Sequence, residues 1–170
     1  MAKITLRGQP CNTIGELPAV GSTAPDFQLT KNDLSDVSLA DFAGKKKLIS
    51  IVPSLDTPVC ANSTRTFNQH AEAHAESVIL VVSADLPFAQ GRFCSGENLD
   101  NVISLSLMRS RDFAKDYGML IVDGPLAGVT GRAVVVLDEN NQVIFSQLIP
   151  EIAQEPDYQS ALAALSGETR

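Results

Sequence analysis

Several kinds of residue are scarce in this chain, and each scarcity narrows what the protein can be. The sequence contains no tryptophan, and its 13 Lys and Arg residues are outnumbered by 20 Asp and Glu residues. The resulting net charge of −7 argues against nucleic acid and anionic membranes as partners, because both present negative phosphates. No apolar run approaches the length of a membrane span.

Cysteine is also scarce, and the chain has only Cys11, Cys60 and Cys94. An odd number of cysteines without regular spacing does not suggest a disulfide framework and favours a reducing compartment. The first eight residues lack the apolar stretch of a secretory signal. We therefore expect a cytoplasmic protein.

The length of 170 residues suits a chain that buries its own core, so we expect a single domain over residues 1–170. Alternating residues at 3–7 and 12–15, on either side of Gly8-Gln9-Pro10, predict an N-terminal β-hairpin. Apolar runs predict further strands at residues 27–29, 48–52, 78–82, 102–107, 132–137 and 142–148. Helical segments are predicted at 38–44, 60–75, 85–96 and 112–117, with Asp85 as an N-cap, and a C-terminal helix ends near Gly167.

Strands and helices alternate along the chain, and an antiparallel strand pair follows them. This order indicates an α/β fold with a central mixed sheet flanked by helices on both faces. The plan resembles the thioredoxin-like fold, with Cys60 at the carboxyl end of a central strand. Open α/β sheets place their ligand sites at such ends.

The sequence Pro53-Ser54-Leu55-Asp56-Thr57-Pro58-Val59-Cys60 links the strand predicted at 48–52 to the helix after it. Cys60 falls in the first helical turn, where free N–H groups and the helix dipole favour an anion such as a thiolate. Thr57 can place its hydroxyl beside the sulfur, and Pro53 and Pro58 stiffen the approach. The same position also suits a buried structural cysteine.

The pattern Pro53-x-x-x-Thr57-x-x-Cys60 resembles the active-site signature of peroxiredoxins. The stretches at residues 53–57, 84–90, 92–94 and 132–136 are similar to the bacterial thiol peroxidase subfamily, and this similarity covers essentially the whole chain. Two features depart from it. Pro58 stands where related sequences carry Gly, and Cys11 is an additional cysteine that we expect to be a bystander.

The resemblance implies a peroxidase that reduces hydrogen peroxide and organic hydroperoxides without metal, flavin or haem. Cys60 would be the peroxidatic cysteine and Cys94 the resolving cysteine of the same subunit, with thioredoxin as the reductant. Arg132 and Thr57 would stabilise the transition state, and Pro53 would shield the sulfur from water. By position alone, Arg132 also fits a surface charge at a strand edge. The resemblance further suggests a homodimer.

Three other functions compete with this interpretation. A thiol–disulfide oxidoreductase of the same fold would carry Cys-x-x-Cys, whereas Cys60 stands alone between Val59 and Ala61. A glutathione-peroxidase-like enzyme would use a tryptophan near its nucleophile, and this chain has none. A redox sensor that passes its disulfide to a partner protein would share Cys60 and Cys94, so the sequence leaves that alternative open.

Two further expectations concern metal binding and motion. His70 and His74 share a helix face, but residue 71 is Ala rather than the Glu of the metalloprotease pattern, so we expect no metal site. Cys60 and Cys94 are placed on different helices, and a disulfide requires Cα atoms within about 7 Å. We therefore predict that the reduced protein holds the two thiols apart and that both segments partly unwind on oxidation.

Overall fold

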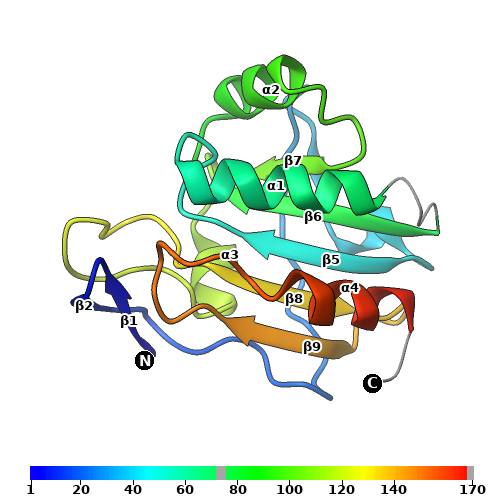
Figure 1. The fold of residues 1–170 in the computed structure, drawn as a ribbon. Helices are drawn as coiled ribbons and strands as arrows, with labels where there is room; N and C mark the ends of the chain where they lie inside the picture. Colours follow the sequence, from blue (N-terminus) through cyan, green and yellow to red (C-terminus); the bar gives the residue numbers. More distant parts are fainter. Residues whose placement is uncertain (72–75, 168–170) are drawn as a thin grey trace.

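A seven-stranded mixed sheet forms the centre of the computed structural model, which describes residues 1–71 and 76–167 (Figure 1). The strand order is β4-β3-β7-β6-β5-β8-β9. The strands are β3 (Leu29–Thr30), β4 (Asp36–Val37), β5 (Lys46–Ile51), β6 (Ser77–Ser83), β7 (Ile103–Ser106), β8 (Ala133–Leu137) and β9 (Val143–Leu148). The central strands β5, β6 and β7 are parallel, and β8, β9, β3 and β4 pair antiparallel to their neighbours. The predicted α/β fold with a mixed sheet is confirmed.

Both faces of the central strands are buried, because successive side chains of a strand point to opposite faces. In β5, Ile49 and Ile51 belong to one core cluster, whereas Leu48 belongs to the other. In β8, Val135 belongs to the cluster of Ile49 and Ile51, whereas Val134 belongs to the cluster of Leu48. Continuous apolar runs in the sequence therefore supply two cores, one on each side of the sheet.

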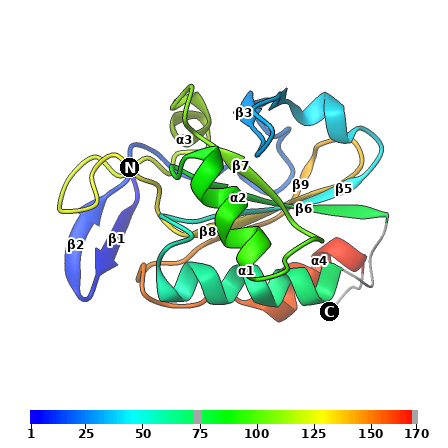
Figure 2. The ribbon, with the colours of Figure 1, turned by 90° about the horizontal axis from the view of Figure 1, so that it is seen from above.

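Helices cover both of these faces (Figure 2). On one side lie α1 (Pro58–Ala71) and α4 (Tyr158–Ser166), and on the other lie α3 (Asp112–Asp116) and a 3₁₀ turn at Leu39–Phe42. The helix α2 (Pro87–Gly96) packs against β7 near the edge of the first side. Helix α1 begins at Pro58, two residues earlier than predicted, because proline suits the first helical position.

The N-terminal hairpin is present, but its second strand was predicted wrongly. The hairpin pairs β1 (Lys3–Leu6) with β2 (Gln9–Asn12). Arg7 and Gly8 make the turn with φ values of 51° and 78°, a combination typical of two-residue hairpin turns. Pro10 therefore lies inside β2 rather than in the turn, where a proline is tolerated in a two-stranded ribbon.

Two other local predictions were wrong. The strand predicted at residues 27–29 is shifted to β3, because the N–H of Phe27 donates to the Asp26 carboxylate (2.8 Å) instead of to a strand. Asp85 does not cap α2. Leu86 occupies that position without a side-chain cap, and the Asp85 carboxylate contacts the loop that precedes α1. Across the described parts of the chain, no helix has both the length and the apolar character needed to span a membrane.

Candidate active site

The register of the sheet places two distant segments beside each other at the carboxyl end of β5. In the antiparallel pairing of β5 with β8, Ile51 is opposite Ala133, so Arg132 lies where β5 gives way to the loop at residues 53–57. The Thr130 hydroxyl donates to the carbonyl of Val52 (2.9 Å) and closes this junction. Helix α1 begins at this end of β5 (Figure 1), and the sulfur of Cys60 in its first turn accepts a hydrogen bond from Arg132.

Cys60 and Arg132 meet in this junction. Cys60 is the third residue of α1 and is 0% exposed. The Nη2 of Arg132 donates to the sulfur of Cys60 at 3.2 Å, and its Nε donates to the carbonyl of Ile152 at 2.8 Å. The backbone N–H groups of the first helical turn lack intrahelical acceptors and add positive potential at the sulfur. The structure thus brings together the predicted nucleophile and the predicted cation.

The guanidinium of Arg132 is a buried charge, since the residue is only 3% exposed. Within residues 1–71 and 76–167, no carboxylate lies within ion-pair distance of it, and its Nη1 is buried without a hydrogen-bond partner. An unpaired buried ion costs several kcal/mol, so a negative charge beside Arg132 is strongly favoured. The sulfur of Cys60 lies beside this charge, and Nη1 remains able to donate to an oxygen that enters the site.

Pro53 and Thr57 lie in the loop between β5 and α1. Pro53 is buried, whereas Thr57 is exposed. The Thr57 hydroxyl donates to the carbonyl of Ser54 at 2.8 Å, which leaves its oxygen as an acceptor. Thr57 therefore helps to shape the loop that leads into the Cys60 turn.

The other two cysteines have different surroundings, and all three are free thiols. Cys94, in α2, is 8% exposed and lies in the same core cluster as Cys60. Burial raises the pKa of the Cys94 thiol, although a hydrogen bond with Ser104 partly opposes this. Burial, together with the negative charges of Asp123 and Glu151, raises the pKa of Cys11. The protonated thiol is favoured at both positions.

Comparison with known proteins agrees with this geometry. A family model described as Redoxin matches residues 19–162. The chain belongs to the Redoxin family. It is 55% identical over 165 residues to the thiol peroxidase of Mycobacterium tuberculosis (strain ATCC 25618 / H37Rv), an alignment that covers 97% of this chain and 99% of that protein. The resemblance to thiol peroxidases seen in the sequence is confirmed.

Solved structures of this group share the fold over nearly the whole chain. The peroxiredoxin-like protein from Aquifex aeolicus superposes with a TM-score of 0.93 at 37% identity, covering 99% of this chain and 98% of that one. The thiol peroxidase from Chromobacterium violaceum gives a TM-score of 0.90 at 26% identity, covering 97% and 95%. The chain is a Redoxin-family peroxiredoxin of the thiol peroxidase type, and its activity is thiol-dependent peroxide reduction.

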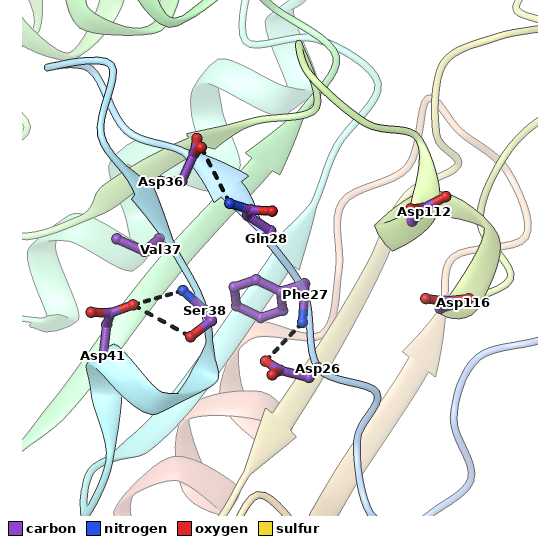
Figure 3. Close-up of a pocket in the computed structure, with 9 residues that line it drawn as sticks. All are labelled: Asp26, Phe27, Gln28, Asp36, Val37, Ser38, Asp41, Asp112 and Asp116. Atoms are coloured by element: carbon purple, nitrogen blue, oxygen red, sulfur yellow. Dashed lines mark hydrogen bonds between the residues drawn. The ribbon is translucent and has the colours of Figure 1, made fainter.

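Away from Cys60, a hollow of this peroxiredoxin is lined by acidic side chains (Figure 3). The aspartates that line it are Asp26, Asp36, Asp41, Asp112 and Asp116. Several of these carboxylates hold their own segments: Asp41 accepts the N–H of Ser38 at 2.8 Å, and Asp26 accepts the N–H of Phe27. Among the described residues, no cysteine lines this hollow, so it is separate from the Cys60–Arg132 pair.

Metal binding finds no support in the described part of the chain, where no cluster of three or more His, Cys, Asp or Glu residues is arranged to hold an ion. His70 lies near the end of α1, and His74 lies outside the described residues.

Sequence reasoning missed two groups at the site. The Ile152 carbonyl orients Arg132, and Asp85 binds the loop before α1. A backbone carbonyl leaves no signal in a sequence, and Asp85 suggested a helix cap because it stands before Pro87.

Proposed function

We propose that Cys60 is the peroxidatic cysteine of this thiol peroxidase and that Arg132 stabilises both its thiolate and the transition state. The thiolate attacks one peroxide oxygen and the O–O bond breaks, which leaves Cys60 as a sulfenic acid. The second oxygen departs as hydroxide or alkoxide and takes up a proton. The observation that carries this proposal is the buried Arg132, which donates to the Cys60 sulfur through Nη2 while Nη1 has no partner in the described structure.

The substrates that we propose are hydrogen peroxide and organic hydroperoxides. Both present the same O–O bond, and the electrons for its cleavage come from the sulfur of Cys60. Developing charge on the leaving oxygen requires donors that are already oriented. The donors that we propose for this oxygen are the Nη1 of Arg132, which has no partner in the described structure, and the N–H groups at the start of α1.

Two loop residues complete the proposed site. Pro53 is buried in the loop between β5 and the Cys60 turn and has no N–H of its own. Its proposed role is to shield the sulfur from water and from further oxidation. The Thr57 hydroxyl donates its proton to the Ser54 carbonyl, which leaves its oxygen able to accept from an incoming O–H donor. A hydroperoxide carries one such proton.

Cys94 is the proposed resolving cysteine. Its thiol attacks the sulfur of the Cys60 sulfenic acid, releases water and forms an intrasubunit Cys60–Cys94 disulfide. A dithiol reductant must then supply two electrons, and thioredoxin is the reductant that we propose. Cys94 shares a core cluster with Cys60 and remains protonated in the resting enzyme, which prevents it from competing for peroxide.

The proposal extends to the whole molecule. Residues 1–170 act as one domain, since Ile4 of the hairpin packs with Ile121 and Ile152 of the main body. A reducing cytoplasm suits three free thiols, and the family resemblance favours a homodimer. Light scattering of the purified protein tests the homodimer, because a monomeric mass would contradict it.

The test of the nucleophile compares Cys60→Ser with Cys11→Ser. A serine hydroxyl stays protonated at neutral pH, so Cys60→Ser should abolish peroxide consumption coupled to thioredoxin and its reductase. Cys11→Ser should retain nearly full activity. Loss of activity in Cys11→Ser alone would overturn the assignment. Stoichiometric rather than catalytic consumption by the parent would instead indicate a redox sensor.

A further inference from the structure

Asp85 lies between the end of β6 and the start of α2, and its carboxylate contacts the loop that precedes Cys60. One oxygen accepts a hydrogen bond from the Ser54 hydroxyl at 2.7 Å. The other accepts from the backbone N–H of Leu55 at 2.8 Å and from the Ser83 hydroxyl at 2.6 Å. Three donors from two separate segments therefore converge on this one carboxylate.

The contacts of Asp85 continue through the loop to the Cys60 turn. The Ser54 hydroxyl also accepts the N–H of Asp56 at 3.1 Å, and the Ser54 carbonyl accepts the Thr57 hydroxyl. The carbonyl of Thr57 then accepts the N–H of Ala61 at 2.9 Å, which closes the turn that contains Cys60. An unbroken series of hydrogen bonds thus joins Asp85 to the first turn of α1.

The opposite side of Asp85 is fixed to the sheet and to α2. Its backbone carbonyl accepts the Ser106 hydroxyl of β7. Its partner Ser83 is also bonded by Gln90, whose Nε2 donates to the Ser83 hydroxyl at 3.0 Å and to the Leu105 carbonyl at 2.9 Å. Gln90 belongs to α2, the helix that carries Cys94. Asp85 lines a cleft together with residues of the loop and of α2, and its carboxylate reaches α2 only through Ser83 and Gln90.

We propose that Asp85 is a positioning residue for the peroxidase reaction. Its carboxylate holds the loop at residues 53–57, and through it the Cys60 turn, in the geometry that receives peroxide. Its place at the start of α2 ties that geometry to the helix of the resolving cysteine. The inference rests on the proposed role of Cys60, because an aligned attack on the O–O bond is the step that a displaced loop would impair.

The test measures how fast peroxide oxidises Cys60 in Asp85→Ala, Asp85→Asn and the parent. Because the chain has no tryptophan, the rate is obtained by competition with a haem peroxidase for limiting hydrogen peroxide. Loop displacement by Asp85→Ala should slow oxidation about 10- to 100-fold. Asp85→Asn keeps one acceptor oxygen and should recover most of the lost rate.

The matched control is Asp123→Ala. Asp123 also accepts a backbone N–H and a side-chain donor, both from Asn12 at 2.7 Å. These bonds join β2 of the hairpin to the segment that follows Ile121, and within the described residues Asp123 makes no bond to the Cys60 loop. If the role of Asp85 were purely structural, Asp85→Ala and Asp123→Ala would both have a lower melting temperature. Peroxide would then oxidise Cys60 at a similar rate in the two variants. Asp123→Ala should therefore keep an oxidation rate within about twofold of the parent.

Ser54→Ala provides a milder variant in case Asp85→Ala fails to fold. It removes only the hydroxyl contact with Asp85 and should slow Cys60 oxidation by a smaller factor. The role of Asp85 would be overturned if folded Asp85 and Ser54 variants oxidised Cys60 at the parent rate. It would also be overturned if Asp123→Ala slowed Cys60 oxidation as much as Asp85→Ala does. A parent enzyme whose Cys60 is not oxidised by peroxide would instead refute the proposed function itself.

Discussion

At the scale of single residues, the three cysteines show how surroundings decide reactivity. Burial alone raises a thiol pKa, and burial is the first cause of the raised pKa at both Cys11 and Cys94. Cys60 is buried as well, but its sulfur faces a guanidinium that has no other counter-ion in the described structure. Of the three cysteines, Cys60 is the one whose sulfur accepts a hydrogen bond from a guanidinium in the described structure, and its proposed role as the nucleophile rests on that contact.

Substitution of Arg132 tests this placement. Lysine keeps the charge but cannot donate at once to Ile152 and Cys60 in the planar geometry of the guanidinium. Loss of one preorganised donor typically costs about 10²- to 10³-fold in rate, so we expect Arg132→Met to fall in that range and Arg132→Lys to lie between it and the parent. Competition kinetics across a pH series measures both effects.

The pH profile separates a catalytic from a surface role for Arg132. Without a neighbouring cation the Cys60 thiolate is less stable, so the pH–rate profile of Arg132→Met should move to higher pH. Identical profiles and rates in the parent and both variants would mean that Arg132 only serves the structure.

Replacement of the resolving cysteine gives a second prediction at this scale. In Cys94→Ser, the Cys60 sulfenic acid has no thiol partner within the subunit and survives to meet another peroxide. We expect Cys60 to accumulate as sulfinic acid, which intact-mass spectrometry detects as two added oxygen atoms. A Cys94→Ser enzyme that stops at one added oxygen under excess peroxide would argue that the site itself blocks the second oxidation.

At the scale of elements, α2 is the segment suited to move. Its N-cap residue, Leu86, makes no side-chain cap, and the helix contains Gly91, which favours unwinding. We predict that Cys94 leaves its buried position in α2 to bond with Cys60 in α1. Hydrogen exchange should therefore be faster at residues 88–96 in the disulfide form than in the dithiol form. Equal protection in the two forms would contradict this motion.

An ion pair fastens the end of α2 to α1. Arg65 in α1 donates twice to Glu97, at 2.8 and 2.9 Å, and Glu97 immediately follows α2. Both side chains are substantially exposed, so the pair contributes little and is screened by salt. Glu97→Gln should accelerate Cys60–Cys94 disulfide formation by less than about fivefold, with the increase fading at high salt.

The matched control for Glu97→Gln is Asp36→Asn. It removes the other ion pair of the described structure, Asp36–Arg109, which joins β4 to the segment after β7. Disulfide formation, followed by quenched alkylation and gel shift, should be unchanged in that control. A slower reaction in Glu97→Gln would mean that the ion pair assists resolution instead of restraining it.

At the scale of the whole molecule, Glu151 fastens the N-terminal hairpin to the body. Its carboxylate accepts the Thr5 hydroxyl at 2.6 Å and the N–H groups of Arg7 and Gly8 at 2.9 and 3.1 Å. The next residue, Ile152, donates its N–H to the Thr5 carbonyl, and its own carbonyl accepts the hydrogen bond from Arg132 Nε. The hairpin, far from Cys60 in sequence, thus braces the loop whose Ile152 carbonyl orients Arg132.

Glu151 should also make stability depend on pH. The Thr5 hydrogen bond, followed by bonds from Gly8, Ala153 and Arg7, lowers the pKa of Glu151 from 4.5 to about 2. A lowered folded-state pKa means that the ionised carboxylate stabilises the fold above pH 4.5, and that this contribution is lost as the pH falls from 4.5 toward about 2. Urea unfolding should give Glu151→Gln a lower free energy of unfolding than the parent at neutral pH. This difference should shrink as the pH falls from 4.5 toward about 2.

Glu139→Gln is the control for that measurement, since Glu139 is exposed in the turn between β8 and β9. The free energy of unfolding of Glu139→Gln should stay close to that of the parent throughout the same pH range. A Glu151→Gln deficit that remains constant down to the acid end of the window would show that the carboxylate charge is not responsible.

Much of the architecture could be predicted from the sequence, because its signals are local. The apolar runs that form β5, β6 and β8 mark strands buried on both faces, and their order with the helices predicts a mixed sheet. Cys60 follows a strand and opens a helix within one short stretch, so its place at a helix N-terminus was also predictable. The register of the hairpin was not, because the turn at Arg7 and Gly8 depends on backbone angles that sequence alternation does not specify.

By itself, the sequence therefore determined the fold class, the position of Cys60 in the first turn of a helix and the family resemblance. Only the tertiary structure decided which distant groups surround Cys60. The pairing of Ile51 with Ala133 sets Arg132 against Cys60, and the neighbouring positions of β5 and β6 set Asp85 against Ser54. The physical reason is that helix and strand signals act over a few residues, whereas these contacts depend on the order and register of strands far apart in the chain.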